Sequence, residues 1–167
     1  MGLMSNLDDI ITEIMQLEGG AVVTNDPDDT GGRTQYGISE HNNPQAWLDG
    51  KVTEQEAREI YLQRYVIFPQ WHTIPSSHQL VQKILIDWSV ISGPQLVTSK
   101  LQQILSVKVD SIFWPQTLAA LVATDPKELN NKLVAERIRM IGRIVSSKPS
   151  QSKFCLGWLN RALEFQV

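Results

Sequence analysis

Apolar residues recur at helical spacing along most of the chain, and turn-forming residues separate the helical stretches. In the first stretch, Ser5 can cap the start, and Gly19-Gly20 ends the helix. Glycine stops a helix because it accepts the left-handed conformation just beyond the last turn. The apolar positions of this first stripe are Leu7, Ile10, Ile11, Ile14 and Leu17.

Further helices are predicted from the same periodicity and from recognisable starts and stops. Thr53 and Glu56 form a capping box, in which each side chain bonds the other residue's backbone N–H. Strand signals are almost absent, with room for one short β-hairpin in the loop 26–38. The pattern therefore predicts an all-α fold. The expected helices cover residues 44–50, 54–65, 80–91, 94–105, 115–121, 126–144 and 154–163.

Composition places the chain among globular proteins. Its 167 residues are 42% hydrophobic and 20% charged, which suits one domain or one and a half with a real core. The single Cys155 excludes an internal disulfide and a thiolate-rich zinc site. The three histidines lack metal-ligand spacing, so we predict no metal and no cofactor. No apolar run reaches the ~20 residues that a transmembrane helix needs, so stable membrane insertion is not expected.

The start of the chain lacks the basic and apolar regions of a signal peptide. The net charge of −3 also hides an asymmetry, since residues 1–40 carry −7 and residues 127–167 carry +5. The basic end is either a solvated helix face or a surface for an anionic polymer. Nucleic acid is a poor candidate, because no stacking aromatics interleave with the basic side chains.

Glu18 carries the strongest chemical signal. It follows Ile14 by four residues and Ile11 by seven, so it shares their apolar face and is expected to be partly buried. Burial raises the pKa of a carboxyl group, as a general acid working near neutrality requires. The two glycines after Glu18 leave room for a bulky substrate to approach.

The loop that follows is rich in carboxylates and glycines. It contains Asp26, Asp28 and Asp29, then Gly31-Gly32 and Thr34. A helix-end acid facing a carboxylate or a carboxylate–hydroxyl pair suits glycoside hydrolysis with inversion. In that reaction, one acid protonates the leaving oxygen while the second group activates water on the opposite face.

The run from Glu18-Gly19-Gly20 to Tyr36-Gly37-Ile38 resembles the N-terminal signature of the glycoside hydrolase family 108 lysozymes. These are phage endolysins and bacterial muramidases. The segments Ala57–Tyr61 and Asp87–Pro94 resemble later motifs of that family. The segments 115–118 and 157–161 resemble its C-terminal peptidoglycan-binding part. The resemblance implies a lysozyme-like fold, with residues 1–94 catalytic and residues 95–167 a helical peptidoglycan-binding part packed on them.

The resemblance also implies roles for individual residues. Glu18 would be the general acid, with Asp29 and Thr34 orienting the water. Asp26 is an alternative to Asp29, and either aspartate could instead stabilise a turn. Thr34 is as well placed to cap the following segment as to hold water. The residues expected to bind substrate are Gly31, Gly32, Arg33, Tyr36 and Trp71.

Some of these residues have a second interpretation. Arg33 either contacts substrate or pairs with Asp29, and Tyr36 lies either in the core or on the wall of a sugar site. Trp71 is the only tryptophan expected to act as a sugar platform, because prolines bound its loop.

The predicted function is cleavage of the β-1,4 bond between N-acetylmuramic acid and N-acetylglucosamine. Peptidoglycan is the expected partner of a monomeric enzyme that is made in the cytoplasm and reaches the wall through a holin or a dedicated secretion route. Two alternatives are a non-catalytic peptidoglycan-binding or secretion-related module and a purely structural helical protein. The structural alternative leaves the glycine–carboxylate loop unexplained.

Overall fold

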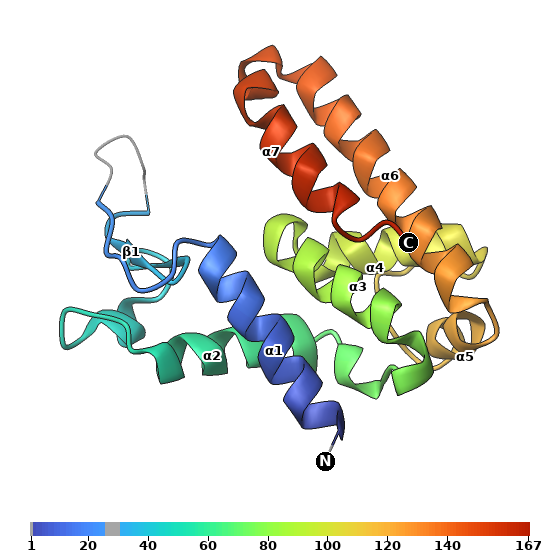
Figure 1. Cartoon of the computed structure of the whole chain (residues 1–167), viewed down its shortest axis with the longest axis horizontal. Coiled ribbons are helices and arrows are strands. Elements are labelled where there is room, and N and C mark those ends of the chain that lie inside the picture. The colour runs from blue at the N-terminus through green and yellow to red at the C-terminus, as the bar shows by residue number, and fades with distance from the viewer. Residues whose placement is uncertain (1, 26–30) are drawn as a thin grey trace. The chain divides into compact units, whose positions relative to one another are not determined.

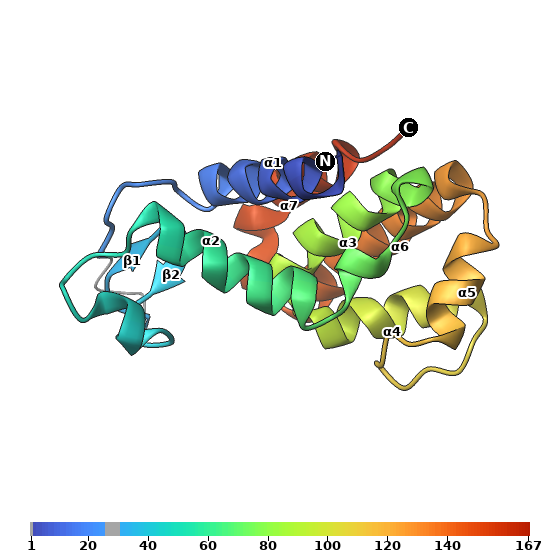
Figure 2. The ribbon, with the colours of Figure 1, turned by 90° about the horizontal axis from the view of Figure 1, so that it is seen from below.

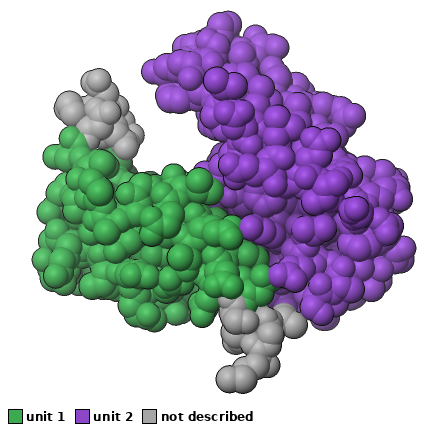
Figure 3. Space-filling view, viewed as in Figure 1, with its two compact units in different colours: residues 1–66 green, residues 67–167 purple. Residues whose placement is uncertain are grey.

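The computed structural model describes residues 2–25 and 31–167, and helices make up most of them (Figure 1). The all-α prediction is therefore confirmed, together with one small hairpin. Contacts divide the chain into two compact units, residues 1–66 and residues 67–167 (Figure 3). This division reflects which residues pack together, whereas the expected boundary after residue 94 lies where the motifs of the catalytic part end.

Unit 1 holds two α-helices and the hairpin. Helix α1 (Gly2–Leu17) packs against α2 (Glu54–Leu62), and Figure 2 shows them side by side. Helix α1 begins at Gly2, so the expected start at Ser5 lies within the helix. Thr53 and Glu56 form the predicted capping box at the start of α2. The buried apolar residues include Ile10, Ile11, Ile14, Ala57 and Tyr61.

The hairpin lies between these two helices in the sequence. Strands β1 (Thr34–Gln35) and β2 (Ile38–Ser39) pair antiparallel, with Gln35 opposite Ile38. The two-residue loop Tyr36–Gly37 has φ values of +52° and +74°, as the tight turns favoured in hairpins require. The backbone of Thr24 pairs with Thr34 on the other edge of β1. A short 3₁₀ helix, η1 (Pro44–Trp47), follows and buries Trp47.

Unit 2 is a helical assembly around α3 (Gln79–Ser92). Helices α4 (Pro94–Leu105) and α6 (Pro126–Ser147) pack on α3, and α5 (Gln116–Val122) packs on α4. Helix α7 (Ser152–Leu163) returns antiparallel along α6 (Figure 1). Between α2 and α3 the chain forms a π-helical turn, η2 (Gln63–Ile67), and two 3₁₀ turns, η3 (Trp71–Thr73) and η4 (Ser76–His78). A further 3₁₀ turn, η5 (Pro149–Gln151), joins α6 to α7.

A buried ion cluster joins three helices of unit 2. Asp87 of α3 lies 2.8 Å from an Arg137 guanidinium nitrogen of α6 and 2.8 Å from one of Arg161 on α7. The Asp87 and Arg137 side chains are only 2% and 3% exposed. Burial lowers the pKa of the Arg137 guanidinium, and attraction to Asp87 opposes that change.

Candidate active site

Glu18 directly follows Leu17, the last residue of α1. Its N–H still donates to the Ile14 carbonyl at 2.9 Å. The next two N–H groups then turn back, Gly19 to the Gln16 carbonyl at 3.2 Å and Gly20 to the Met15 carbonyl at 2.9 Å. These two bonds define a Schellman motif, with Gly19 at φ +104°. The glycine pair therefore ends the helix as predicted and leaves Glu18 half-buried at its tip.

The hairpin turn docks directly against Glu18. The Tyr36 N–H donates to the Gly20 carbonyl at 2.8 Å. A Cβ atom added at Gly37 would lie 2.8 Å from the Glu18 Cβ and 3.3 Å from its Cγ. The Gly37 backbone is therefore in close contact with the Glu18 stem, and glycine is required there for space as well as for its positive φ. Thus the structure brings Glu18 together with Tyr36 and Gly37.

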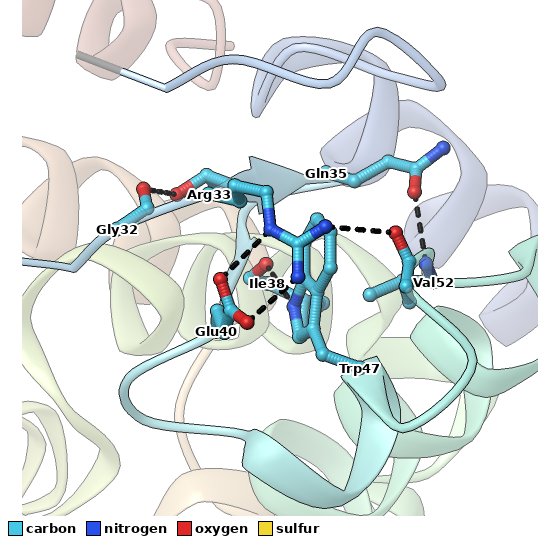
Figure 4. Close-up of polar contacts among 9 residues, drawn as sticks. Gly32, Arg33, Gln35, Ile38, Glu40, Trp47 and Val52 are labelled. Carbon is cyan, nitrogen blue, oxygen red and sulfur yellow. Dashed lines mark hydrogen bonds and ion pairs between the residues drawn. The ribbon is translucent and has the colours of Figure 1, made fainter.

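Arg33 has a partner within unit 1. Its guanidinium donates to both carboxylate oxygens of Glu40, at 2.9 and 2.7 Å, and to the Gly50 carbonyl at 3.2 Å (Figure 4). It also lies 4.9 Å from the centre of the Trp47 ring. The hydrogen bond from Arg33 lowers the pKa of the Glu40 carboxyl, and the same bond raises the pKa of Arg33. Arg33, which was expected to contact substrate or Asp29, thus connects the hairpin to the segment around Trp47 and Gly50.

Thr34 and Gln35 fix the two sides of β1. The Thr34 N–H and carbonyl both bond the Thr24 backbone, and its hydroxyl lies 3.4 Å from the Gly32 carbonyl. The Gln35 side-chain oxygen accepts from the Val52 N–H at 2.9 Å (Figure 4). Its amide nitrogen donates to the Ala21 carbonyl, also at 2.9 Å. Gln35 is therefore a positioning residue that sequence patterns did not single out, since a lone polar residue in a loop has no periodic signature.

Gly31 and Gly32 shape the start of the hairpin. Both are partly exposed, and Gly32 has φ +70°. The Gly31 carbonyl accepts from the His41 N–H at 3.0 Å, which closes the base of the loop. Asp26 and Asp29, the two candidates for holding the water, lie outside the described residues.

Trp71 requires a correction. It is 0% exposed, its indole N–H donates to the Ser89 hydroxyl at 3.3 Å, and its ring packs edge-on against Phe113. A fully enclosed ring has no face to offer a sugar, so Trp71 is a core residue of unit 2. Prolines lie on both sides of its loop because the chain turns tightly around the buried Trp71 ring.

The expected basic surface near the C-terminus also needs revision. Arg137 and Arg161 bind Asp87 inside unit 2, so neither belongs to a solvent-facing patch for an anionic polymer. Arg139 and Arg143 remain exposed, with side chains 66% and 57% accessible, but each lies close to Glu136. The outward positive charge of this end is therefore smaller than the count of basic residues indicates.

Within residues 2–25 and 31–167, no three histidine, cysteine or acidic side chains gather as metal ligands. In the same described ranges, every helix is too short or too polar to cross a membrane.

Comparisons with known proteins match both parts of the chain. Residues 11–93 match the family model described as glycosyl hydrolase 108, and residues 96–163 match one described as a predicted peptidoglycan domain. The solved structure titled Brucella abortus SagA is similar to this chain, with a TM-score of 0.69 at 23% identity. The match covers 97% of this chain and 96% of SagA, and at this identity it shows a shared fold. A search of curated proteins gives no match. The chain therefore belongs to the glycosyl hydrolase 108 family, as a peptidoglycan-degrading glycosidase with a C-terminal peptidoglycan-binding domain.

Proposed function

We propose that the enzyme is a muramidase of the lysozyme type, which hydrolyses the β-1,4 bond between N-acetylmuramic acid and N-acetylglucosamine with Glu18 as general acid. The observation that carries the proposal is the placement of Glu18. It is half-buried at the end of α1, pressed against the Gly37 turn, and inside the segment that matches the glycosyl hydrolase family. A half-buried glutamate beside backbone without side chains suits protonation of a leaving oxygen, because a bulky substrate can approach it.

The proposed mechanism is inverting. Glu18 gives its proton to the glycosidic oxygen as the bond to the anomeric carbon breaks. A water molecule attacks from the opposite face, oriented by Asp29 with help from the Thr34 hydroxyl. Inverting enzymes hold their two carboxyl groups about 6.5–9.5 Å apart to accommodate this water, whereas retaining enzymes hold them about 5–5.5 Å apart. Thr34 suits this role because the Thr24 backbone holds it through both its N–H and its carbonyl.

Replacing Glu18 by glutamine tests the acid. The amide is nearly isosteric but cannot deliver a proton, so wall lysis should fall by about 10²–10⁴-fold with the fold unchanged. Mass spectrometry of digested peptidoglycan would identify the cleaved bond through the sugar that carries the new reducing end. If Glu18→Gln kept more than half of the wild-type activity, Glu18 would not be the general acid.

Proton NMR of the first-formed product tests the stereochemistry, because inversion requires an α-configured reducing end and a β-configured one contradicts the scheme. Comparison of Asp29→Asn with Asp26→Asn then identifies the water-holding carboxylate. Asp29→Asn should cost less activity than Glu18→Gln, since Thr34 can still hold the water. Binding to wall glycan with no cleavage by the wild-type protein would favour the alternative of a non-catalytic peptidoglycan-binding or secretion-related module.

The proposal leaves two routes to the wall open. An endolysin would be released through a phage holin, and a bacterial muramidase would use a dedicated secretion route. Both would act as monomers on peptidoglycan outside the cytoplasm.

A further inference from the structure

Tyr61 of α2 reaches from the core of unit 1 to the hairpin turn. The side chain is 3% exposed, and its hydroxyl donates to the Tyr36 carbonyl at 2.9 Å. The same turn is bonded on its other side, because the Tyr36 N–H donates to the Gly20 carbonyl. The peptide units around Tyr36 are therefore held between the end of α1 and the side of α2.

Gly37 lies in contact with both Tyr61 and Glu18. A Cβ atom at Gly37 would be 2.5 Å from the Tyr61 hydroxyl oxygen and 2.8 Å from the Glu18 Cβ. Such distances are shorter than any ordinary van der Waals contact. The Tyr61 hydroxyl and the Glu18 stem thus both border the space that a side chain at Gly37 would fill, and a shift of the turn moves the surface on which that stem rests.

We propose that Tyr61 is a positioning residue for catalysis: its hydroxyl fixes the Tyr36–Gly37 turn, and the turn fixes the direction of the Glu18 side chain. This inference rests on the proposed role of Glu18 as general acid. Proton transfer needs the donor within about 2.6–3.2 Å of its target, so a small displacement of the carboxyl lowers the rate of the chemical step. Substrate affinity should not change, because the Tyr61 side chain is buried.

The direct test is Tyr61→Phe, which removes one oxygen atom and keeps the ring. Tyr65→Phe is the matched control, since the Tyr65 ring packs on Tyr61 with centroids 5.7 Å apart and the change removes the same atom. Turnover of peptidoglycan by Tyr61→Phe should fall about tenfold in kcat, with KM within about twofold of wild type. Tyr65→Phe should keep both values. Rates are normalised to the folded fraction measured by near-UV circular dichroism.

Two results would overturn the inference. Unchanged kcat in Tyr61→Phe means that the hydroxyl does not position the acid. A rise in KM at constant kcat would instead show that Tyr61 contributes to substrate binding. That pattern arises when an interaction of equal strength in the ground state and the transition state is lost.

A double-mutant comparison separates this inference from the proposed function. When glutamine replaces Glu18, adding Tyr61→Phe should lower the residual rate less than twofold, because residues that act as a unit are not additive. A full tenfold further loss would show that Tyr61 acts independently of Glu18. If Glu18→Gln alone stays active, the proposed function fails. If it is inactive while Tyr61→Phe is fully active, only the positioning role fails.

Discussion

Units 1 and 2 each place a carboxylate on a helix that also carries core residues, and they hold it in different ways. Asp87 of unit 2 is 2% exposed, and the guanidinium groups of Arg137 and Arg161 bind both of its oxygens. Glu18 of unit 1 is half-buried at a helix end, and its Cβ and Cγ pack on the backbone of Gly37. Unit 2 thus fixes its carboxylate through the charged oxygens, and unit 1 supports the aliphatic stem.

This difference bears on function. A buried carboxylate whose two oxygens pair with arginines from two other helices joins three helices, which suits structure and not proton transfer. A general acid must point its carboxyl at the leaving oxygen, and the contact of the Glu18 stem with Gly37 orients the side chain through its carbon atoms. The contrast indicates that Asp87 belongs to the architecture of unit 2, although it begins the segment Asp87–Pro94, one of the motifs by which the chain resembles its family.

The largest effect should come from breaking the Asp87 cluster. Asp87→Asn leaves Arg137 buried without its counter-charge, and loss of one partner of a buried pair costs about 3–5 kcal/mol. Chemical denaturation monitored by far-UV circular dichroism would measure this loss. The control is Glu128→Gln, since the exposed Glu128–Lys132 pair should contribute no more than about 1 kcal/mol. Equal losses for the two variants would contradict the structural role of Asp87.

Gly37→Ala should have the next largest effect and should act on unit 1. The new methyl group would overlap both the Tyr61 hydroxyl and the Glu18 stem, and overpacking of this kind costs about 1–3 kcal/mol. Activity should fall further than stability explains, because the methyl group displaces Glu18. Gly50→Ala is a matched control: its φ of +84° is equally strained, but its added Cβ would meet only Arg33 at 3.9 Å. Similar activity in the two variants would show that the Gly37 turn does not position Glu18.

The Arg33–Glu40 pair predicts a smaller, pH-dependent effect. Arg33 lowers the pKa of Glu40 in the folded protein below its ordinary value of 4.5. The stabilisation of the hairpin is therefore complete above about pH 4.5 and is lost as the pH falls through the lowered folded-state value. NMR titration of the Glu40 carboxyl should give a midpoint below 4.5, and Arg33→Leu should move it upward. A midpoint that does not respond to Arg33→Leu would contradict the pair.

The smallest effect is expected at the exposed basic residues of unit 2. Double reversal Arg139→Glu with Arg143→Glu should weaken binding to isolated cell walls modestly, because Glu136 already offsets part of their charge. This attraction should fade with added salt, since exposed charges are screened over about 10 Å at 0.1 M. Pull-down of walls at several salt concentrations measures both effects. Binding that does not change with salt concentration would indicate that these arginines lie on an ordinary solvated helix face.

Several features of the fold could be read from the sequence because they depend on near neighbours. Helical periodicity, the Thr53–Glu56 capping box and the Glu18-Gly19-Gly20 helix end all involve residues within about one turn of each other. Such contacts form with the same geometry in any protein, so a pattern of residue types predicts them. For that reason the helices of unit 2 begin and end within a few residues of the expected positions.

Other features depended on the tertiary structure. Asp87 meets Arg137 and Arg161 across 50 and 74 residues of sequence, and Tyr61 meets the Tyr36 carbonyl across 25. Contacts over such separations have no period, because loops of any length can join the packed helices. The sequence therefore identified Glu18 at a helix end, whereas only the packing of α1, α2 and the hairpin decided what supports its side chain. Packing likewise decided that Trp71 fills a core and that two of the basic residues lie inside the protein.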